Sequence, residues 1–460
     1  MNTKHIAVID IGKTNAKLAL VDLDDLSEIA VATRPNIVLS GPPWPHFDVD
    51  GHWTFLLDAL KNFHALHGVD AISVTTHGAC VALLDNSGNL AAPIMDYEHS
   101  GPEEVTTEYD KIRPLFSETG SPRLPFGLNI GAQLYWMFEQ DNELLDRIDS
   151  IVTYPQYWGH RLTGVAATDI TSLGCHTDLW NPYQKQFSSL IESLAIQNKI
   201  APMRIPSSVL GRILPAIANR TGLSVDTLVY SGIHDSNASL LPHLKSYEPP
   251  FSVVSTGTWV IAMSIGGKQP ELDPTDDTLI NVNAFGDPVM SARFMGGREY
   301  DMVIGEFAVE PSDLEIEKVL RDDVMLLPAV VPDAGPFMGM QSIWKSQEPN
   351  HGSGQRTAAV GFYLSLVTAR CLELIGHEGP IIIEGPFARN RCFLMMLSVA
   401  AGCEVKAMDS ATGTSAGAAL LASADVKAKW GSNEQINIVP TQFFDLLERY
   451  AKQWRSLVIS

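Results

Sequence analysis

The chain has 460 residues, of which 45% are hydrophobic and 18% are charged. This composition is ordinary for a globular protein and far from that of a disordered chain, and the length predicts two domains of roughly 200 residues each. The net charge of −21 argues against nucleic acid and against an anionic membrane surface as general partners, because an acidic protein is repelled by phosphate-rich surfaces.

The amino terminus and the cysteines indicate the compartment. The first four residues lead directly into a predicted strand, and no apolar run reaches the length of a membrane span. The cysteines form no Cys-x-x-Cys pair, and no histidine cluster lies at zinc-ligand spacing, so we interpret them as reduced core thiols. They are Cys80, Cys175, Cys371, Cys392 and Cys403. We therefore expect a cytoplasmic protein without a membrane partner.

The amino-terminal part of the chain combines strands with a helix. Apolar runs at 5–9, 16–20 and 29–31 predict three strands with an antiparallel start. Residues 53–63 carry apolar side chains at spacings of three and four, which predicts an amphipathic helix. A further buried strand at 71–74 leads into a polar segment that contains glycine. This order of elements indicates an α/β fold.

The rest of the chain repeats a pattern of strand, glycine turn and helix. A largely helical stretch is predicted from 130 to 194. A strand at 228–231 breaks at Gly232 and runs into a helix, and a strand at 381–384 runs into a Gly-Pro turn. Residues 413–419 open a helix with almost no side chains on one face. That face either packs tightly on another element or allows a flat adenine ring to lie against the backbone.

Two short stretches in opposite halves of the chain have the same pattern. Residues 7–18 and 253–260 each contain an apolar strand, a turn of glycine and hydroxyl residues, and a second apolar strand. Glycine allows close backbone approach, and successive N–H groups form an anion nest, although the same residues also satisfy ordinary turn geometry. Because the pattern occurs twice, we interpret both turns as phosphate-binding hairpins, with Asp10 placed to share a magnesium ion with the phosphate.

Two polar residues near strand ends are candidates for chemistry. His77 follows a predicted strand and precedes Gly78 and Ala79. It is either a hydrogen-bonded rim histidine or a residue that binds a sugar hydroxyl. Asp235 lies at a strand-to-helix turn, where it is either the N-terminal cap of the helix or the base that takes a proton from an attacking hydroxyl.

Taken in chain order, these motifs resemble those of the FGGY family of carbohydrate kinases over nearly the whole chain. The segments that resemble the family are Asp10-Ile11-Gly12-Lys13-Thr14-Asn15, Thr76-His77-Gly78-Ala79, Tyr157 to Gly164 with Thr168-Asp169, Gly232-Ile233-His234-Asp235, Ser255-Thr256-Gly257-Thr258-Trp259, and Glu384-Gly385 with Arg389-Asn390 and Gly413 to Gly417. The resemblance implies an α/β fold of two actin/hexokinase-like (ribonuclease H-like) domains with an interdomain catalytic cleft. Residues 1–229 are then the N-terminal sugar-binding domain, and residues 230–460 are the C-terminal nucleotide-binding domain.

The resemblance also implies roles for individual residues. Asp235 is expected to be the catalytic base, and Asp10 and Asp235 are expected to hold Mg²⁺. The sugar is expected to contact Lys13, Thr76, His77, Gly78, His234 and Asp235. ATP is expected to contact Gly12, Lys13, Thr14, Asn15, Lys17, Thr256, Gly257, Thr258, Gly297, Gly385, Pro386 and Asn390. The implied reaction transfers the γ-phosphoryl group of ATP to a primary hydroxyl of a small-molecule ketose with five or six carbons, of the L-rhamnulose, L-fuculose or xylulose type.

Two positions depart from the family's motifs. Glu384 stands where the adenosine motif usually opens with glycine, which leaves the nucleotide preference open. Lys13 replaces a small hydroxylated residue, and either adds a cation near the transferred phosphate or faces solvent. An actin-like or Hsp70-like ATPase would share both phosphate turns but has no need of His77 or of a base at Asp235. A sugar-sensing binding protein would normally carry a DNA-binding helix pair. The oligomeric state stays open, with a homodimer as one assembly.

Overall fold

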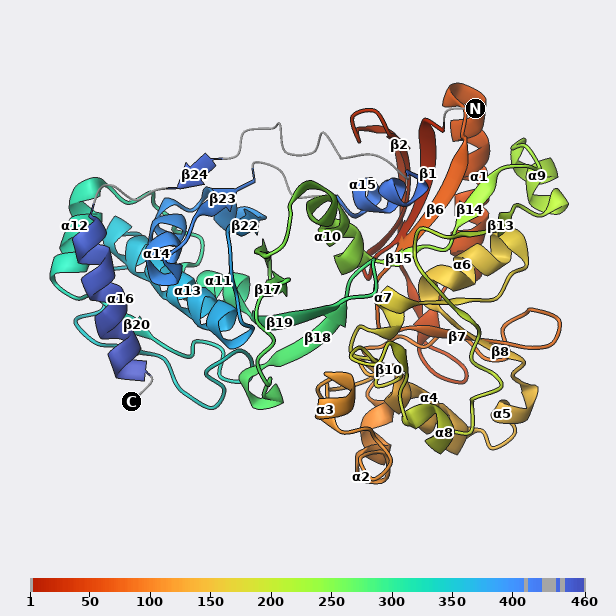
Figure 1. Ribbon diagram of the computed structural model, residues 1–460, viewed down its shortest axis with the longest axis horizontal. Coiled ribbons are helices and arrows are strands. Elements are labelled where there is room, and N and C mark those ends of the chain that lie inside the picture. Colours follow the sequence, from red (N-terminus) through yellow and green to blue (C-terminus); the bar gives the residue numbers. More distant parts are fainter. Residues whose placement is uncertain (1–2, 409–412, 424–435, 439–442, 459–460) are drawn as a thin grey trace. The chain divides into compact units, whose positions relative to one another are not determined.

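The computed structural model describes residues 3–408, 413–423, 436–438 and 443–458, and the chain divides into two compact units (Figure 1). Unit 1 contains residues 1–246, 280–288 and 412–430, and unit 2 contains residues 247–279, 289–411 and 431–460. The assignment of sugar binding and nucleotide binding to residues 1–229 and 230–460 stays a prediction.

Unit 1 is built on a sheet in which β1 has a hairpin partner on one side and a parallel partner on the other. β1 (His5–Ile11) pairs antiparallel with β2 (Asn15–Asp22) and parallel with β6 (Ala71–Thr76). Every residue of β6, and every residue of β1 after His5, is buried, so both faces of the sheet are covered. The path of the sheet is β13-β14-β6-β1-β2-β3, completed by β3 (Glu28–Pro35), β13 (Val209–Arg212), β14 (Leu228–Tyr230) and β15 (Ile233–His234), which pairs with β6.

Helices and short strands complete unit 1. α1 (Val49–His67) begins after Asp48, whose side chain caps it by accepting a hydrogen bond from the Gly51 N–H. The other helices are α2 (Thr106–Tyr109), α3 (Phe116–Thr119), α4 (Ile130–Gln140), α5 (Leu144–Arg147), α6 (Tyr154–Thr163), α7 (Ile170–Leu173), α8 (Leu190–Ser193), α9 (Pro215–Thr221), α10 (Asp235–Ser246) and α15 (Thr414–Ala419). β4 (Val38–Leu39) pairs with β5 (His46–Phe47).

The stretch from 130 to 194 is less helical than its sequence predicts. Its helices α4 to α8 alternate with β8 (Ser150–Thr153), β9 (Thr168–Asp169), β10 (Trp180–Asn181) and β11 (Gln186–Phe187). β8 pairs with β7 (Val81–Leu84), and β9 pairs with β12 (Met203–Arg204). Both partner strands lie outside the stretch. Local periodicity misses these strands because tertiary pairing, not propensity, decides their conformation.

Unit 2 repeats the pairing found around β1. β16 (Phe251–Thr256) pairs antiparallel with β17 (Val260–Ile265) and parallel with β22 (Ile381–Glu384). The sheet order is β18-β19-β17-β16-β22-β23-β24, with β18 (Thr278–Val282), β19 (Pro288–Phe294), β23 (Val405–Ala407) and β24 (Ile436–Ile438), while β20 (Leu326–Leu327) pairs separately with β21 (Ile343–Trp344). Each predicted phosphate hairpin therefore has a parallel strand beside its first strand.

The longest helix of unit 2 forms its core. α13 (Gly354–Leu374) is, among the described residues, the one helix long and apolar enough to cross a membrane by length and composition. Most of its residues are buried, and it packs against α12 (Asp313–Arg321) and α14 (Arg391–Ala401) (Figure 1). We therefore interpret α13 as a core helix. The other helices of unit 2 are α11 (Gly296–Ile304) and α16 (Phe444–Val458).

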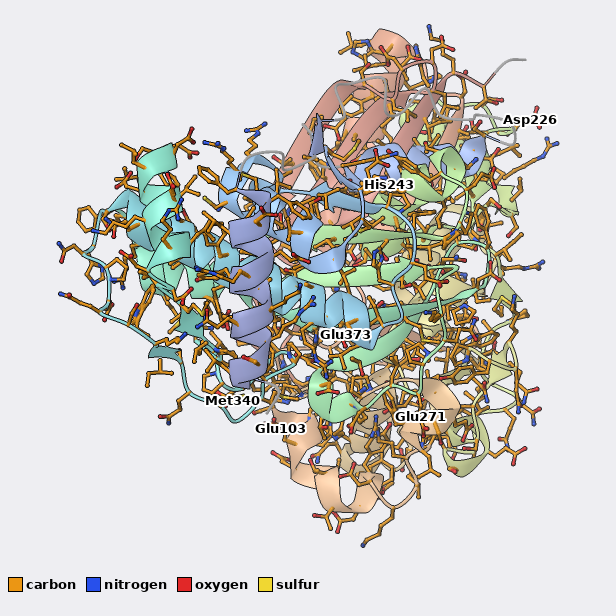
Figure 2. All side chains as sticks on the ribbon, turned by 60° about the vertical axis from the view of Figure 1, so that its left-hand side comes forward. Glu103, Asp226, His243, Glu271, Met340 and Glu373 are labelled. Carbon is orange, nitrogen blue, oxygen red and sulfur yellow. The ribbon has the colours of Figure 1, made fainter. Side chains whose placement is uncertain are left out.

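Exposed carboxylates at the surface contrast with polar side chains that are buried in the interior. The carboxylates Glu103, Asp226, Glu271 and Glu373 are exposed, whereas His243 of α10 is fully buried (Figure 2). Because these four carboxylates keep their hydration at the surface, they add negative charge without a cost of burial. Buried carboxylates such as Asp169 need hydrogen-bond donors instead.

The face of α15 that lacks side chains packs within unit 1. In Figure 1 this helix lies beside β1 and β2, although it is far from them in sequence. A Cβ atom on Gly417 would lie 1.7 Å from the backbone oxygen of Ala238 in α10. The Ser73 hydroxyl donates a hydrogen bond of 2.7 Å to the Ala418 carbonyl. Of the two interpretations of this helix, tight packing is therefore the one that the geometry of Gly417 shows.

We predict that Gly417→Ala destabilises the protein, because the added methyl forces α15 away from α10. Overpacking of this kind costs about 1–3 kcal/mol and sometimes more. The matched control is Gly413→Ala, since no atom of the described residues, apart from its chain neighbours, lies within 4 Å of the Cβ position there and its φ is −65°. Thermal and urea unfolding should show a lower midpoint for the first variant only. Equal midpoints for the two variants would contradict the packing argument.

Candidate functional site

The turn between β1 and β2 is fixed by hydrogen bonds at its base. The Gly12 N–H donates to the Asn15 carbonyl at 2.9 Å, and the Asn36 side chain donates to the Gly12 carbonyl at 2.8 Å. The Asn36 N–H also donates to the Thr14 carbonyl at 2.8 Å. These bonds hold the turn from both sides, while Thr14 and Asn15 stay exposed.

The carboxylate of Asp10 lies beside this turn in a polar environment. Its side chain accepts hydrogen bonds from the hydroxyls of Thr414 at 2.5 Å and Ser415 at 3.3 Å. The ammonium of Lys17 lies 3.4 Å from the same oxygen, Oδ2. The residue is only 8% exposed, so these partners replace the water that a buried charge loses. The first turn of α15 therefore supports Asp10, a contact between residues 404 positions apart.

Asp235 is placed by a backbone turn that only glycine forms without strain. Gly232 has φ +94°, and its Cβ position would lie 2.8 Å from the Val74 carbonyl. After this turn, β15 pairs in parallel with the end of β6, so that His234 is opposite Thr76. Asp235 then begins α10. The segment that carries His77 and the turn that carries Asp235 therefore lie side by side.

The electrostatic environment holds Asp235 partly protonated near neutral pH. Burial raises its pKa to about 6, and the Asp10 carboxylate acts in the same direction, while hydrogen bonds from Ser236 oppose the rise. Its Oδ1 accepts a hydrogen bond of 2.6 Å from the Ser236 N–H. The side chain is still 31% exposed. A carboxylate that is accessible and has a raised pKa is suited to exchanging protons.

His234 supports this carboxylate from the side of β6. Its Nε2 lies 3.2 Å from Asp235 Oδ1. Burial lowers the pKa of His234 to about 4, so the ring is neutral. A Cβ atom on Gly78 would lie 2.6 Å from this Nε2, which explains the glycine at that position.

His77 presents an acceptor without a partner. Its Nδ1–H donates to the Gly78 carbonyl at 2.9 Å, which leaves Nε2 as the acceptor nitrogen. That Nε2 is buried and makes no hydrogen bond within the described residues. Burial lowers the pKa of His77 to about 4, so the ring is neutral. A buried acceptor without a partner is costly, and the hydroxyl of a ligand would satisfy it.

Aromatic rings enclose His77. Ring centroids of Phe47, Tyr97 and Tyr154 lie 5.2, 5.3 and 5.1 Å from its own. Lys13 also reaches this cluster, with its ammonium 4.6 Å from the Tyr97 ring centroid. Lys13 is therefore not simply directed into solvent, the second of the two roles considered from its sequence position. Neutral aromatic walls with a few fixed polar groups are typical of a small-molecule pocket.

A buried polar network fixes the turn before Asp235. The Asp169 carboxylate caps α7 by accepting hydrogen bonds from the N–H groups of Thr171 and Ser172. The Thr171 hydroxyl donates to Asp169 at 2.5 Å and accepts from the His234 N–H at 3.0 Å. The Gln156 side chain donates to the Ser231 carbonyl at 2.8 Å. Backbone position on both sides of Gly232 is thus determined by side chains from α6 and α7.

The second hairpin, between β16 and β17 in unit 2, lies against backbone segments that approach closely at two glycines. Cβ atoms on Gly297 and Gly385 would lie 2.0 and 1.9 Å from the backbone oxygens of Gly257 and Thr256. The Thr256 hydroxyl donates to the Glu384 carbonyl at 2.5 Å and accepts from the Phe387 N–H at 3.1 Å. The predicted turn, the start of α11 and the end of β22 therefore approach one another at backbone distance.

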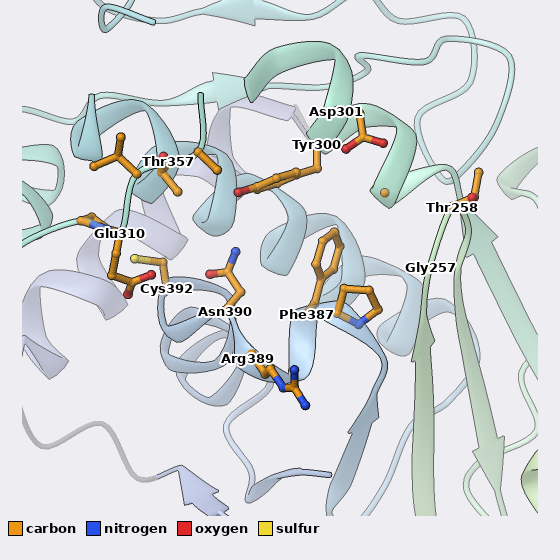
Figure 3. Close-up of a pocket in the computed structure, with 15 residues that line it drawn as sticks. Gly257, Thr258, Tyr300, Asp301, Glu310, Thr357, Phe387, Arg389, Asn390 and Cys392 are labelled. Atoms are coloured by element: carbon orange, nitrogen blue, oxygen red, sulfur yellow. The ribbon is translucent and has the colours of Figure 1, made fainter. Parts of the chain in front are cut away.

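A cavity of about 580 Å³ opens beside this hairpin. In Figure 3 Tyr300, Phe387 and Asn390 surround it, and the Tyr300 and Phe387 ring centroids are 5.9 Å apart. It is lined by Gly257, Thr258, Gly297, Tyr300, Asp301, Ala308, Val309, Glu310, Pro311, Thr357, Pro386, Phe387, Arg389, Asn390 and Cys392. A cavity of this size with aromatic walls and a glycine turn at its edge fits a planar heterocycle that carries phosphates.

The predicted site residues fall into two groups. Asp10, residues 12–15, Lys17, residues 76–78 and residues 234–235 belong to unit 1. Residues 256–258, Gly297, residues 385–386 and Asn390 belong to unit 2, where five of them line the cavity and Thr256 and Gly385 contact each other behind it. In the part of the chain that the structure describes, no group of three or more His, Cys, Asp or Glu side chains is arranged to hold a metal ion.

Several residues of these groups carry no signal in the sequence. Phe47, Tyr97, Tyr154, Thr171 and Gln156 lie in unrelated segments, and only the fold brings them to His77 and to the turn before Asp235. The wall residues Tyr300 and Phe387 are also unremarkable in sequence.

Comparisons with known proteins agree over both units. Residues 5–242 match the family model "FGGY family of carbohydrate kinases, N-terminal domain", and residues 248–430 match "Carbohydrate kinase FGGY, C-terminal domain". The chain is 26% identical to L-fuculokinase of Escherichia coli over 453 residues, which cover 91% of this chain and 92% of the relative.

Solved structures confirm the predicted fold class. A carbohydrate kinase from Novosphingobium aromaticivorans is 36% identical, with a TM-score of 0.90 over 98% of this chain and all of that one. A xylulose kinase from Lactobacillus acidophilus is 14% identical, with a TM-score of 0.76 over 99% of each chain, and this second likeness concerns the fold alone. The predicted pair of actin/hexokinase-like α/β domains is therefore the architecture of this chain.

We predict that Thr171→Val lowers the stability of unit 1 whereas Thr171→Ser does not. Valine removes the hydroxyl, which leaves the His234 N–H and one Asp169 interaction unsatisfied in a buried place, at a cost of about 1–3 kcal/mol. Urea unfolding should separate the two variants by that amount. If valine and serine gave the same midpoint, the hydroxyl would not be the group that fixes the turn.

Proposed function

The chain belongs to the FGGY family of carbohydrate kinases, and from this premise we propose that it phosphorylates a primary hydroxyl of a five- or six-carbon ketose of the L-fuculose, L-rhamnulose or xylulose type. As a carbohydrate kinase it uses ATP and a small-molecule sugar. The observation that carries the proposal for the acceptor is the buried, unpartnered Nε2 of His77 beside the accessible carboxylate of Asp235.

The acceptor binds, in this proposal, in the aromatic pocket of unit 1. A sugar hydroxyl donates to His77 Nε2, which is neutral and therefore able to accept. The flat faces of Phe47, Tyr97 and Tyr154 contact the carbon skeleton of the sugar. Thr76 and Gly78 contact the sugar as small residues. The Thr76 hydroxyl already donates a hydrogen bond to the His77 carbonyl, so it does not serve as a donor to the sugar.

Asp235 is the proposed general base. It orients the primary hydroxyl and takes its proton as the oxygen attacks phosphorus. The His234 ring lies beside Oδ1, which accepts from the Ser236 N–H, so Oδ2 is the oxygen that faces the substrate in this proposal. The turn at Gly232 and the network through Thr171 hold the carboxylate in place, so less orientational freedom is lost at the moment of reaction.

The nucleotide is the proposed occupant of the cavity in unit 2. Tyr300 and Phe387 offer faces to the base, and the backbone of Thr258 offers an N–H donor to phosphate, whereas the Gly257 N–H closes the turn by donating to the Trp259 carbonyl. The residues Gly297, Gly385, Pro386 and Asn390 keep the roles expected from sequence. In unit 1, residues 12–15 and Lys17 are the proposed partners of the transferred phosphate.

Asp10 and Asp235 fit a magnesium ion. Mg²⁺ in such sites is held by one or two carboxylates together with phosphates and water. The Asp10 carboxylate contributes to the raised pKa of Asp235, and a cation relieves a repulsion of this kind. When bound, Mg²⁺ supplies charge neutralisation on the phosphates of the nucleotide.

The proposal extends to the compartment. ATP and sugar are cytoplasmic metabolites, and the five cysteines are thiols, four of them buried. We place the protein in the cytoplasm, with a homodimer as the assembly to test by light scattering.

A coupled ADP-release screen tests the activity. The panel contains L-fuculose, L-rhamnulose, D-xylulose, L-xylulose, L-ribulose, D-fructose, erythrulose and glycerol, each with and without Mg²⁺. We expect turnover with at least one five- or six-carbon ketose and none without Mg²⁺. ADP release that does not depend on any sugar would favour an actin-like or Hsp70-like ATPase instead.

We predict that Asp235→Asn lowers kcat by about 10²- to 10⁴-fold, the range of a lost general base, while nucleotide affinity stays the same. The matched control is Asp226→Asn, an exposed carboxylate of the same unit that pairs with Arg212. Steady-state kinetics and nucleotide titration measure the two effects. More than a tenth of the wild-type kcat in the first variant would rule out this role.

We predict that His77→Ala weakens sugar binding by about 1–3 kcal/mol, the worth of one hydrogen bond to a buried acceptor. ATP hydrolysis in the absence of sugar should be nearly unchanged. Calorimetry with the best acceptor measures the affinity, and His67→Ala, an exposed histidine on α1, is the control. Equal affinity in His77→Ala and wild type would mean that His77 is a rim residue without a ligand.

A further inference from the structure

Three charged residues form a cluster at the edge of the aromatic pocket, which we call the Lys13 cluster: Lys13, Asp96 and Glu98. The Lys13 ammonium contacts Asp96 Oδ1 and lies 3.0 Å from Glu98 Oε2. Asp96 is 7% exposed, whereas the side chain of Glu98 is 61% exposed. The cluster therefore has one buried and one accessible carboxylate around a single ammonium.

The cluster adjoins the aromatic rings that pack on His77. The Lys13 ammonium lies 4.6 Å from the centroid of the Tyr97 ring and 5.4 Å from that of Phe47. Both rings pack directly on His77. These cation–π contacts and the ion pair with Asp96 fix the lysine at the pocket wall, where its flexible chain would otherwise reach solvent.

Asp96 has one carboxylate oxygen, Oδ2, that is able to accept a further hydrogen bond. Its Oδ1 accepts from Lys13 and, at 3.3 Å, from the Glu98 N–H. Its Oδ2 makes no hydrogen bond to any of the described residues. A carboxylate oxygen of this kind accepts well from a neutral hydroxyl, and His77 Nε2 is a second acceptor without a partner among the described residues.

Negative charge is in excess in this cluster. Within the Lys13 cluster the carboxylates of Asp96 and Glu98 outnumber the single ammonium of Lys13, and the neighbouring His77 ring is neutral. In a partly buried site such an excess repels an anionic ligand more strongly than it would in water.

We propose that the Lys13 cluster determines acceptor selectivity: Asp96 binds a hydroxyl of an uncharged polyhydroxy sugar, and the excess of carboxylates excludes sugar acids and sugar phosphates. The inference rests on the proposed sugar kinase function. Lys13 is a positioning residue here, because it acts on the sugar through Asp96. Asp96 is the group that touches substrate, and Glu98 contributes charge.

The first test compares affinity with turnover. L-fuculose, L-rhamnulose and D-xylulose are assayed with wild type, Asp96→Asn, Lys13→Met and the control Lys185→Met, which breaks an exposed ion pair with Asp287. Asp96→Asn should raise KM for the accepted ketose by about tenfold or more, the effect of one lost charged hydrogen bond, with kcat within about threefold. Lys13→Met should raise this KM as well, because Asp96 loses its ion-pair partner. Lys185→Met should leave both constants unchanged. An unchanged KM in Asp96→Asn would overturn the assignment.

The second test compares an uncharged acceptor with an anionic one. Each ketose is compared with the aldonate of the same carbon skeleton. Wild type should use the aldonate with kcat/KM at least about 100-fold lower, and Asp96→Asn and Glu98→Gln should narrow this gap by about tenfold each. Glu98 is exposed enough for its glutamine variant to fold even where substitution of Asp96 disturbs the pocket. Raising the salt concentration should narrow the wild-type gap as well.

The outcomes separate the two proposals. If wild type used aldonates as well as ketoses, the selectivity inference would be wrong while the kinase stood. The selectivity inference would also be overturned if the ratio of kcat/KM between ketose and aldonate did not change in Glu98→Gln and Asp96→Asn. Absence of turnover with every ketose and every aldonate would overturn the proposed acceptor class itself, and with it the inference.

Discussion

The parallel pairing of β15 with the end of β6 is the contact on which the proposed acceptor site depends. It places His234 opposite Thr76, and so sets His77 and Asp235 side by side from segments far apart in sequence. Two glycines permit it: Gly232 adopts a positive φ against the Val74 carbonyl, and Gly78 leaves room for the His234 ring. The raised pKa of Asp235 and the lowered pKa of His77 follow from the burial that this pairing imposes.

The same arrangement of paired strands occurs in both units. In each sheet, the first strand of a hairpin pairs in parallel with a strand that comes later in the chain: β1 with β6, and β16 with β22. The environments differ. In unit 1 the first turn is fixed by Asn36 and lies beside the carboxylate of Asp10. In unit 2 glycine contacts bring the turn against α11 and the end of β22, beside a cavity with aromatic walls. Similar backbones thus have different surroundings: a carboxylate beside the first turn and a cavity with aromatic walls beside the second.

The sequence predicted what depends on local pattern. Both hairpins, the helix at 53–63, the strand before His77 and the turn at Gly232 are read from periodicity and glycine position, and the structure has them. Features that depend on contacts between distant segments of the chain were not predicted. β8 and β9 interrupt a stretch that looks helical, the carboxylates around Lys13 come from residues 96 and 98, and Thr171 reaches the Asp235 turn across the fold. The two interpretations of α15 also needed the structure, because only the position of Ala238 decides how Gly417 packs.

The central claim is that Asp235 acts as a base whose pKa is raised to about 6. The most direct measurement is the pH dependence of kcat/KM for the best ketose between pH 5 and 9, which reports ionisations of the free enzyme. Since the base must be deprotonated, log(kcat/KM) should rise with a slope of about one below pH 6 and level off above it. The inflection should be absent from the residual activity of Asp235→Asn. A flat wild-type profile, or the same inflection in the variant, would contradict the account.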